Sequence, residues 1–157
     1  MLEEILRAVF GAFFGAIGFA MLVHTPRRAL LVSGLIASFA YMVYWSCLCL
    51  GLSDHSAIFL GSLFGSLAGQ LYARKMKIIS TIFLMSAVVP VVPGLGLYRM
   101  MSYLGRNQLS AGAGMGISAM ITIGMISLGL GAGTLLAHYL FSFADKKQLR
   151  SADKKTP

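Results

Sequence analysis

Residues 87–100, AVVPVVPGLGLYRM, place two prolines, two glycines and an arginine deep in an apolar segment of the chain. Pro90 and Pro93 each lack a backbone N–H, and each clashes with the preceding turn of a helix. Gly94 and Gly96 can adopt backbone angles that other residues avoid. The pattern predicts a helix that stops close to Pro90 and restarts close to Gly94, which leaves backbone groups without helical partners inside an apolar run.

The composition around this stretch is that of a membrane protein. Of the 157 residues, 57% are hydrophobic and only 11% are charged, and the mean hydropathy is +0.80. A soluble domain carries about 25% charged residues, so this chain has too little polar surface to cover a globule in water. We therefore expect an all-α integral membrane protein. The net charge of +8 lies mainly in connections and in the tail, which argues against nucleic acid binding.

Five apolar runs are candidates to cross a bilayer, which takes about 17–25 residues, although the third is short. They are Leu6–Val23, Ala29–Leu50, Ala57–Tyr72, Ile78–Leu97 and Gly114–Phe141. With the N-terminus outside, ten of the thirteen Lys and Arg residues fall on the cytoplasmic side, as the positive-inside rule requires. We expect residues 1–143 to form a five-span domain and residues 144–157 to form a basic cytoplasmic tail within reach of membrane lipid.

Small residues recur at helical spacing in three of these runs, which places them on one face of each helix. Such a face lets a second helix approach closely. The candidates for helix packing are Gly11, Gly15, Gly18, Gly61, Gly65, Gly69, Gly129 and Gly133. Polar residues at similar spacing are candidates to line a transport pathway instead: Ser66, Gln70, Ser118 and Thr122. So many close-approach faces also predict a partner chain or a homo-oligomer.

The predicted break has two interpretations. At about 1.5 Å per residue from Ile78, Pro90 lies roughly 18 Å into a hydrocarbon core about 30 Å thick. Irregular backbone at that depth survives only inside protein or beside a watery cavity, and a helix N-terminus attracts carboxylates. The break would then form a substrate site from Pro90, Pro93, Gly94, Gly96 and Tyr98. The alternative is a helix that ends at Pro-Gly and continues into an outer loop.

The same motif resembles a known family. The pattern P-x-x-P-G-x-x-x-Y at Pro90–Tyr98, preceded by GFA-x5-P at Gly18–Pro26 with Arg28 just after it, is similar to the bacterial threonine/serine exporter family. The resemblance covers about residues 5–142. More narrowly, the chain resembles the small five-span subunit that corresponds to the family's C-terminal half. Arg99 has no counterpart in the family pattern, so no role transfers to it.

The resemblance implies secondary transport across the bacterial inner membrane, with threonine and serine as the exported substrates and no cofactor. Related split pairs imply small dicarboxylates such as succinate as an alternative. The resemblance also implies a partner, a second five-span subunit with a cytoplasmic N-terminal extension. Two halves with an odd number of spans would have opposite orientations, as in the inverted repeats of many transporters.

The sequence lacks the patterns that indicate an enzyme, since it shows no acid pair, no nucleophile–histidine–acid arrangement, no phosphate loop and no cluster of metal ligands. None of its five acidic residues falls inside a predicted span. If transport is coupled to protons, we therefore expect the titrating residue to belong to the partner. The rival hypothesis is an accessory subunit that stabilises or localises the transporter without contacting substrate.

Overall fold

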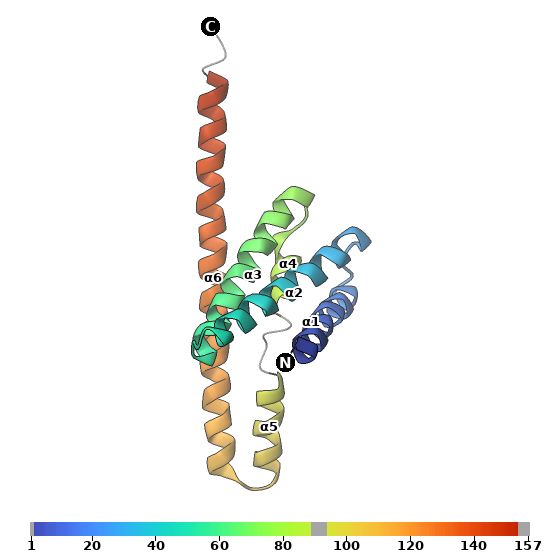
Figure 1. The fold of residues 1–157 in the computed structure, drawn as a ribbon, viewed down its shortest axis with the longest axis vertical. Helices are drawn as coiled ribbons and strands as arrows, with labels where there is room; N and C mark the ends of the chain where they lie inside the picture. The colour runs from blue at the N-terminus through green and yellow to red at the C-terminus, as the bar shows by residue number, and fades with distance from the viewer. Residues whose placement is uncertain (1, 89–93, 154–157) are drawn as a thin grey trace.

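The computed structural model describes residues 2–88 and 94–153, with side chains described up to Ser142 except at positions 2, 4 and 95. Within these ranges the chain forms six α-helices and no strand (Figure 1). The helices are α1 (Leu2–Leu22), α2 (Arg27–Cys49), α3 (Asp54–Met76), α4 (Ser80–Val88), α5 (Gly94–Gly105) and α6 (Leu109–Asp153). The prediction of an all-α fold is confirmed for the described residues.

Four of these helices are long and apolar enough to cross a membrane, namely α1, α2, α3 and α6. They correspond to four of the five predicted spans. The remaining predicted span, Ile78–Leu97, covers α4 and the first residues of α5. Pro90 and Pro93 lie outside the described residues. The count of five spans and the break in the fourth therefore stay predictions.

Short connections of three or four residues join most of the helices and make neighbours antiparallel. His24, Lys77 and Asn107 each take a left-handed backbone conformation, with φ of 57°, 54° and 60°, at the turns after α1, α3 and α5. At the end of α3, the N–H of Lys77 bonds to backbone carbonyls of the last helical turn, so this left-handed residue caps the helix.

Within the first four helices, α3 packs against α2 and α4, and α1 packs against α2 and α4. The largest fully buried side chain among the described residues is Phe83 of α4, which lies in a cluster with Ile36 of α2 and Ala73 of α3. On the other side of α2, α1 approaches so closely that a Cβ added at Gly34 would lie 2.7 Å from the ring of Phe13. Close packing in this bundle therefore relies on small residues as much as on large ones.

The long helix α6 lies along α3 and continues past both of its ends (Figure 1). Its 45 residues span about 67 Å, more than twice the thickness of a hydrocarbon core. α5 packs antiparallel against its first turns, where a Cβ at Gly112 or Gly116 would meet Leu104 or Met100. One interpretation has the chain continue from Pro-Gly into an outer loop, and in the structure residues 94–105 form the helix α5.

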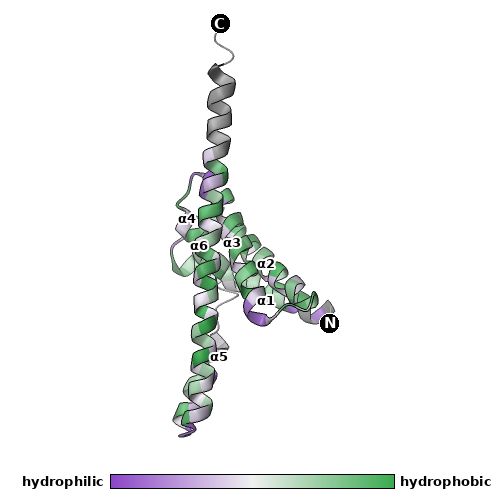
Figure 2. Ribbon diagram, turned by 90° about the vertical axis from the view of Figure 1, so that its left-hand side faces the viewer, coloured by the Kyte–Doolittle hydropathy of each residue, from purple (hydrophilic) through white to green (hydrophobic). Residues whose placement is uncertain are grey.

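Many large apolar side chains are exposed on the outside of the bundle. Figure 2 shows that hydrophobic residues predominate along α1, α2 and the described part of α6. Phe14, Leu35, Met120 and Leu135 are between 61% and 76% exposed. Such a surface suits contact with lipid or with another membrane protein rather than with water. Beyond Ser142 the backbone of α6 continues to Asp153, so the predicted domain boundary at residue 143 falls within a helix.

Candidate functional site

α3 and α6 meet where the glycines of α6 face serines of α3. A Cβ added at Gly129 would overlap the hydroxyl of Ser62, and one at Gly133 would lie 2.9 Å from Cβ of Ser66. The two pairs have the same offset in residue number, so the helices run parallel in a fixed register. The axes can come this close only because neither position carries a side chain.

Ser66 is fully buried in this α3–α6 interface and its hydroxyl is already bonded there. Its Oγ donates to the backbone oxygen of Leu130 at 3.1 Å and lies 3.3 Å from Oγ1 of Thr134. Thr134 donates to the same carbonyl at 2.8 Å. In this conformation Ser66 joins two helices and does not face an open pathway.

The glycines of α3 contact two further helices. A Cβ at Gly61 would lie 3.1 Å from the backbone oxygen of Ala40 on α2, and one at Gly65 would lie 3.2 Å from Cβ of Ala87 on α4. A Cβ at Gly69 would lie 3.3 Å from Cβ of Phe83. These three glycines thus form the face of α3 on which α2 and α4 rest.

The glycines of α1 are placed differently. A Cβ added at Gly11, Gly15 or Gly18 would meet nothing within 4 Å in the described chain. α1 instead buries its alanines, which are Ala12, Ala16 and Ala20. The glycine face of α1 therefore points away from the bundle.

The other pathway candidates are not gathered at one point. Thr122 is buried on α6, and its Oγ1 donates to the backbone oxygen of Ser118 at 3.0 Å. Ser118 is itself exposed, and Gln70 is half-buried on α3. Because Thr122 precedes Leu130 by eight positions, about 12 Å of helix separates it from the bonded carbonyl beside Ser66.

α4 ends at Val88, the last described residue before the predicted break. Val88 packs against a cluster formed by Ile58 of α3 and Ile126 of α6, and Tyr44 of α2 packs against the same cluster. The end of α4 is thus held between three helices.

Tyr44 also carries a polar contact that the sequence did not predict. Its hydroxyl donates to Oδ1 of Asp54 at 2.7 Å across the α2–α3 turn. Asp54 is the first residue of α3, where a negative charge is favoured by the helix dipole. The only feature of the sequence that could have indicated this pair is a tyrosine before a short turn and an aspartate directly after it. The pair brings a carboxylate next to the tyrosine that packs near the end of α4.

The residues expected to follow the break lie at the start of α5. Gly94 is exposed with nothing within 4 Å of an added Cβ, Gly96 is half-buried, and Tyr98 is 71% exposed. Pro90 and Pro93 fall outside the described residues, so the five candidates cannot be assembled into one geometry.

A family model described as the threonine/serine exporter ThrE matches residues 8–136 of the chain. The chain belongs to the threonine/serine exporter family. The match includes α2, α3, α4 and α5 and most of α1 and of the apolar part of α6. No solved structure matches the chain. The resemblance inferred from the Pro-x-x-Pro-Gly motif is confirmed at the level of the family.

Membership identifies the chain as a transporter-type membrane protein, since the family is a class of exporters and not of enzymes. In this exporter chain, the ring nitrogens Nε1 of Trp45 and Nδ1 of His55 are buried without a hydrogen-bond partner in the described residues. The register of the α3–α6 interface places His55 level with Thr122. His55 lies one turn before Ile58 on α3, and Ile58 belongs to the cluster against which Val88 of α4 packs.

Proposed function

We propose that the chain is one subunit of a secondary transporter that exports small carboxylate-bearing metabolites across the bacterial inner membrane. Threonine and serine are the first candidates, and a dicarboxylate such as succinate is the alternative. The match to the exporter family over residues 8–136 is the observation that carries this proposal. The distribution of basic residues supports five spans, with the N-terminus outside and the C-terminus in the cytoplasm.

The proposed substrate site lies at the break between α4 and α5. α5 begins at Gly94, and the first N–H groups of a helix have no partners within it and carry a partial positive charge. They suit a substrate carboxylate. The position of Val88 against the cluster of Ile58 and Ile126 supports this location, because it places the end of α4 among other helices.

The proposed partner is a second five-span subunit with a cytoplasmic N-terminal extension. The register of the α3–α6 interface places Asp54 level with Ile121, so Leu109–Met120 extends about 18 Å beyond the start of α3. Met120 and Ile117 in this projection are 76% and 62% exposed. An apolar projection of this kind favours coverage by another membrane protein. The open glycine face of α1 supports the same conclusion.

Export of labelled threonine and labelled succinate, from cells that lack their own exporters, tests the proposal. The substitution Gly94→Leu blocks the start of α5, and we expect it to abolish export while leaving membrane assembly intact. Gly114→Leu is the matched control, because a Cβ at Gly114 also meets nothing within 4 Å. If the chain is only an accessory subunit, the Gly94→Leu variant should either keep both assembly and export or lose both.

A further inference from the structure

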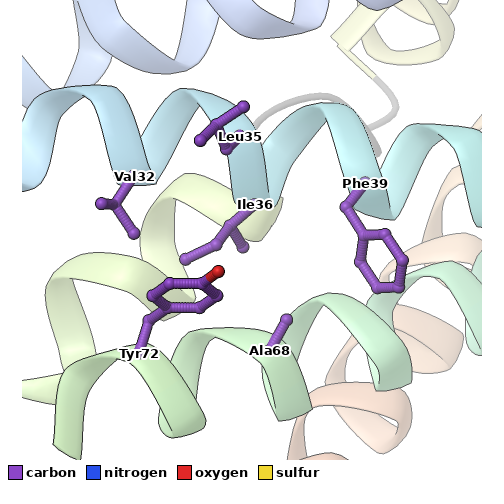
Figure 3. A pocket seen from close by; sticks show the side chains of 6 residues that line it. All are labelled: Val32, Leu35, Ile36, Phe39, Ala68 and Tyr72. Carbon is purple, nitrogen blue, oxygen red and sulfur yellow. The ribbon is translucent and has the colours of Figure 1, made fainter. Parts of the chain in front are cut away.

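A groove of about 400 Å³ opens between α2 and α3 (Figure 3). Phe39 of α2 and Tyr72 of α3 extend toward each other's helices on either side of Ala68. Ile36, which is only 2% exposed, forms the floor and packs in the cluster that contains Phe83 of α4. The lining residues are Val32, Leu35, Ile36, Phe39, Ala68 and Tyr72.

The walls of the groove are almost entirely apolar, since the hydroxyl of Tyr72 is the only polar side-chain group among the six lining residues. Leu35 and Phe39 are 61% and 46% exposed, so the groove opens on the outside of the bundle. A site without hydrogen-bonding groups offers nothing to a polar metabolite, but it suits a hydrocarbon chain.

Basic side chains stand at one end of this groove. Arg27 is five residues before Val32 on α2, about 7 Å along the helix. Lys77, the residue that caps α3, is five residues after Tyr72. Arg28 and Lys75 lie beside them, and these four side chains are exposed.

The described acidic side chains lie away from this basic end. Among the residues whose side chains are described, the acids are Glu3 and Asp54, at the starts of α1 and α3. Val9 of α1 accepts a hydrogen bond from Ser38 of α2, so the start of α1 lies toward the end of α2, away from Arg27. The groove therefore has a basic end without a described acid.

We propose that the groove binds an acyl chain of an anionic phospholipid, whose phosphate lies at the basic ends of α2 and α3. The apolar walls select a hydrocarbon chain, and the cluster of Arg and Lys selects a negatively charged headgroup. Tyr72 stands between the two regions, where its hydroxyl can donate to the ester oxygens of the lipid. This lipid site goes beyond the export function and lies apart from the break between α4 and α5.

Native mass spectrometry of the full chain in detergent tests the proposal, with phosphatidylglycerol or phosphatidylcholine added at equal mole fraction. We expect a bound phosphatidylglycerol to be favoured by about tenfold, because basic pockets between membrane helices bind anionic headgroups. Arg27→Gln together with Arg28→Gln should reduce that preference toward equality. If the chain without substitutions binds the two lipids equally, the basic residues do not select an anionic headgroup, and the proposal is overturned.

Filling the groove tests the role of the acyl chain. Ala68→Phe should lower phosphatidylglycerol retention by at least about fivefold, since the added ring occupies apolar volume that the chain would fill. Ala111→Phe, at an exposed position of α6, is the matched control. Circular dichroism shows whether Ala68→Phe disturbs folding. If it does, Leu35→Trp replaces it as the test, because this substitution narrows the groove from its exposed side.

Retention unchanged by both groove substitutions would refute the site. A photoreactive residue at Leu35 gives a separate answer in native membranes. Cross-links to phospholipid support the proposal, whereas cross-links only to a protein helix would assign the groove to a subunit interface and overturn it.

Discussion

Replacing Gly133 by alanine tests whether the α3–α6 interface depends on the absence of a side chain. The new Cβ would lie 2.6 Å from the backbone oxygen of Leu63, whereas ordinary contacts begin at 3.4 Å. The helices must therefore separate by about 0.8 Å. Overpacking of this kind costs about 1–3 kcal/mol. Stretching the bond from Ser66 to Leu130 adds about 0.6 kcal/mol, a typical value for hydrogen bonds between membrane helices.

Gly131→Ala is the matched control, because a Cβ there meets nothing within 4 Å. Alanine favours a helix over glycine by up to about 1 kcal/mol, so this variant should be unchanged or slightly more stable. Unfolding of the purified chain in mixed detergent and SDS, followed by circular dichroism, measures both variants. We expect Gly133→Ala to be less stable than Gly131→Ala by about 2–3 kcal/mol. Equal unfolding midpoints would refute the close contact between α3 and α6.

Two further substitutions address the partner and the polar pair. Gly15→Leu should leave the isolated chain unchanged or slightly more stable to unfolding, because an added Cβ meets nothing within 4 Å and leucine favours a helix over glycine. The same substitution should reduce co-purification with a second subunit, and unchanged co-purification would remove the glycine face of α1 from the interface. Tyr44→Phe removes the hydrogen bond to Asp54. We expect it to change stability by less than about 1 kcal/mol but to lower threonine export, and export at the unchanged rate would make the pair structural only.

How much of this bundle the sequence predicts differs between its helices. Apolar runs bounded by charged or turn-forming residues are sufficient to predict α1, α2, α3 and α6, because burial in lipid depends on length and hydropathy. The same criteria cannot place α4 and α5, which are each too short to span a membrane alone. The family motif predicts an interruption between them, and the residues at the centre of that predicted break lie outside the described ones.

α1 shows why packing faces are harder to predict than helices. It carries two faces of small residues with similar spacing, and periodicity alone cannot say which one turns inward. The glycines at 11, 15 and 18 drew attention because glycine permits the closest approach. In the structure the buried face is the other one, which holds Ala12, Ala16 and Ala20.

The Tyr44–Asp54 pair could not be predicted for a different reason. Its hydrogen bond depends on how α2 and α3 rotate about their axes, and that rotation is set by the contact of Gly61 with Ala40 and Tyr44. The contact between α2 and α3 at Gly61 thus determines whether the Tyr44 hydroxyl can reach Asp54 across the α2–α3 turn. Sequence spacing describes each helix separately, so it carries no information about such a relation.

α3 is the helix that makes most of the close contacts in the described bundle. It contacts α2 and α4 through Gly61, Gly65 and Gly69, and it contacts α6 through Ser62 and Ser66. Small residues allow close approach but interlock little, so helices that meet through them can slide with few rotamer changes. α4 contacts this glycine face through Phe83 and Ala87, and its last described residue, Val88, precedes the predicted break. We infer that export requires α4 to shift along α3.

A cross-link between α3 and α4 tests this inference. A Cβ at Gly65 would lie 3.2 Å from Cβ of Ala87, a few tenths of an ångström below the separation of about 3.5–4.5 Å found in disulfides, so Gly65→Cys and Ala87→Cys should form one after a small shift of the helices. Ala40→Gly makes room for the new side chain, and Cys47 and Cys49 are replaced by serine because both are free thiols. The oxidised variant should assemble but not export, and reduction should restore export. If the cross-linked protein exports as fast as its reduced form, α4 does not move against α3 during transport.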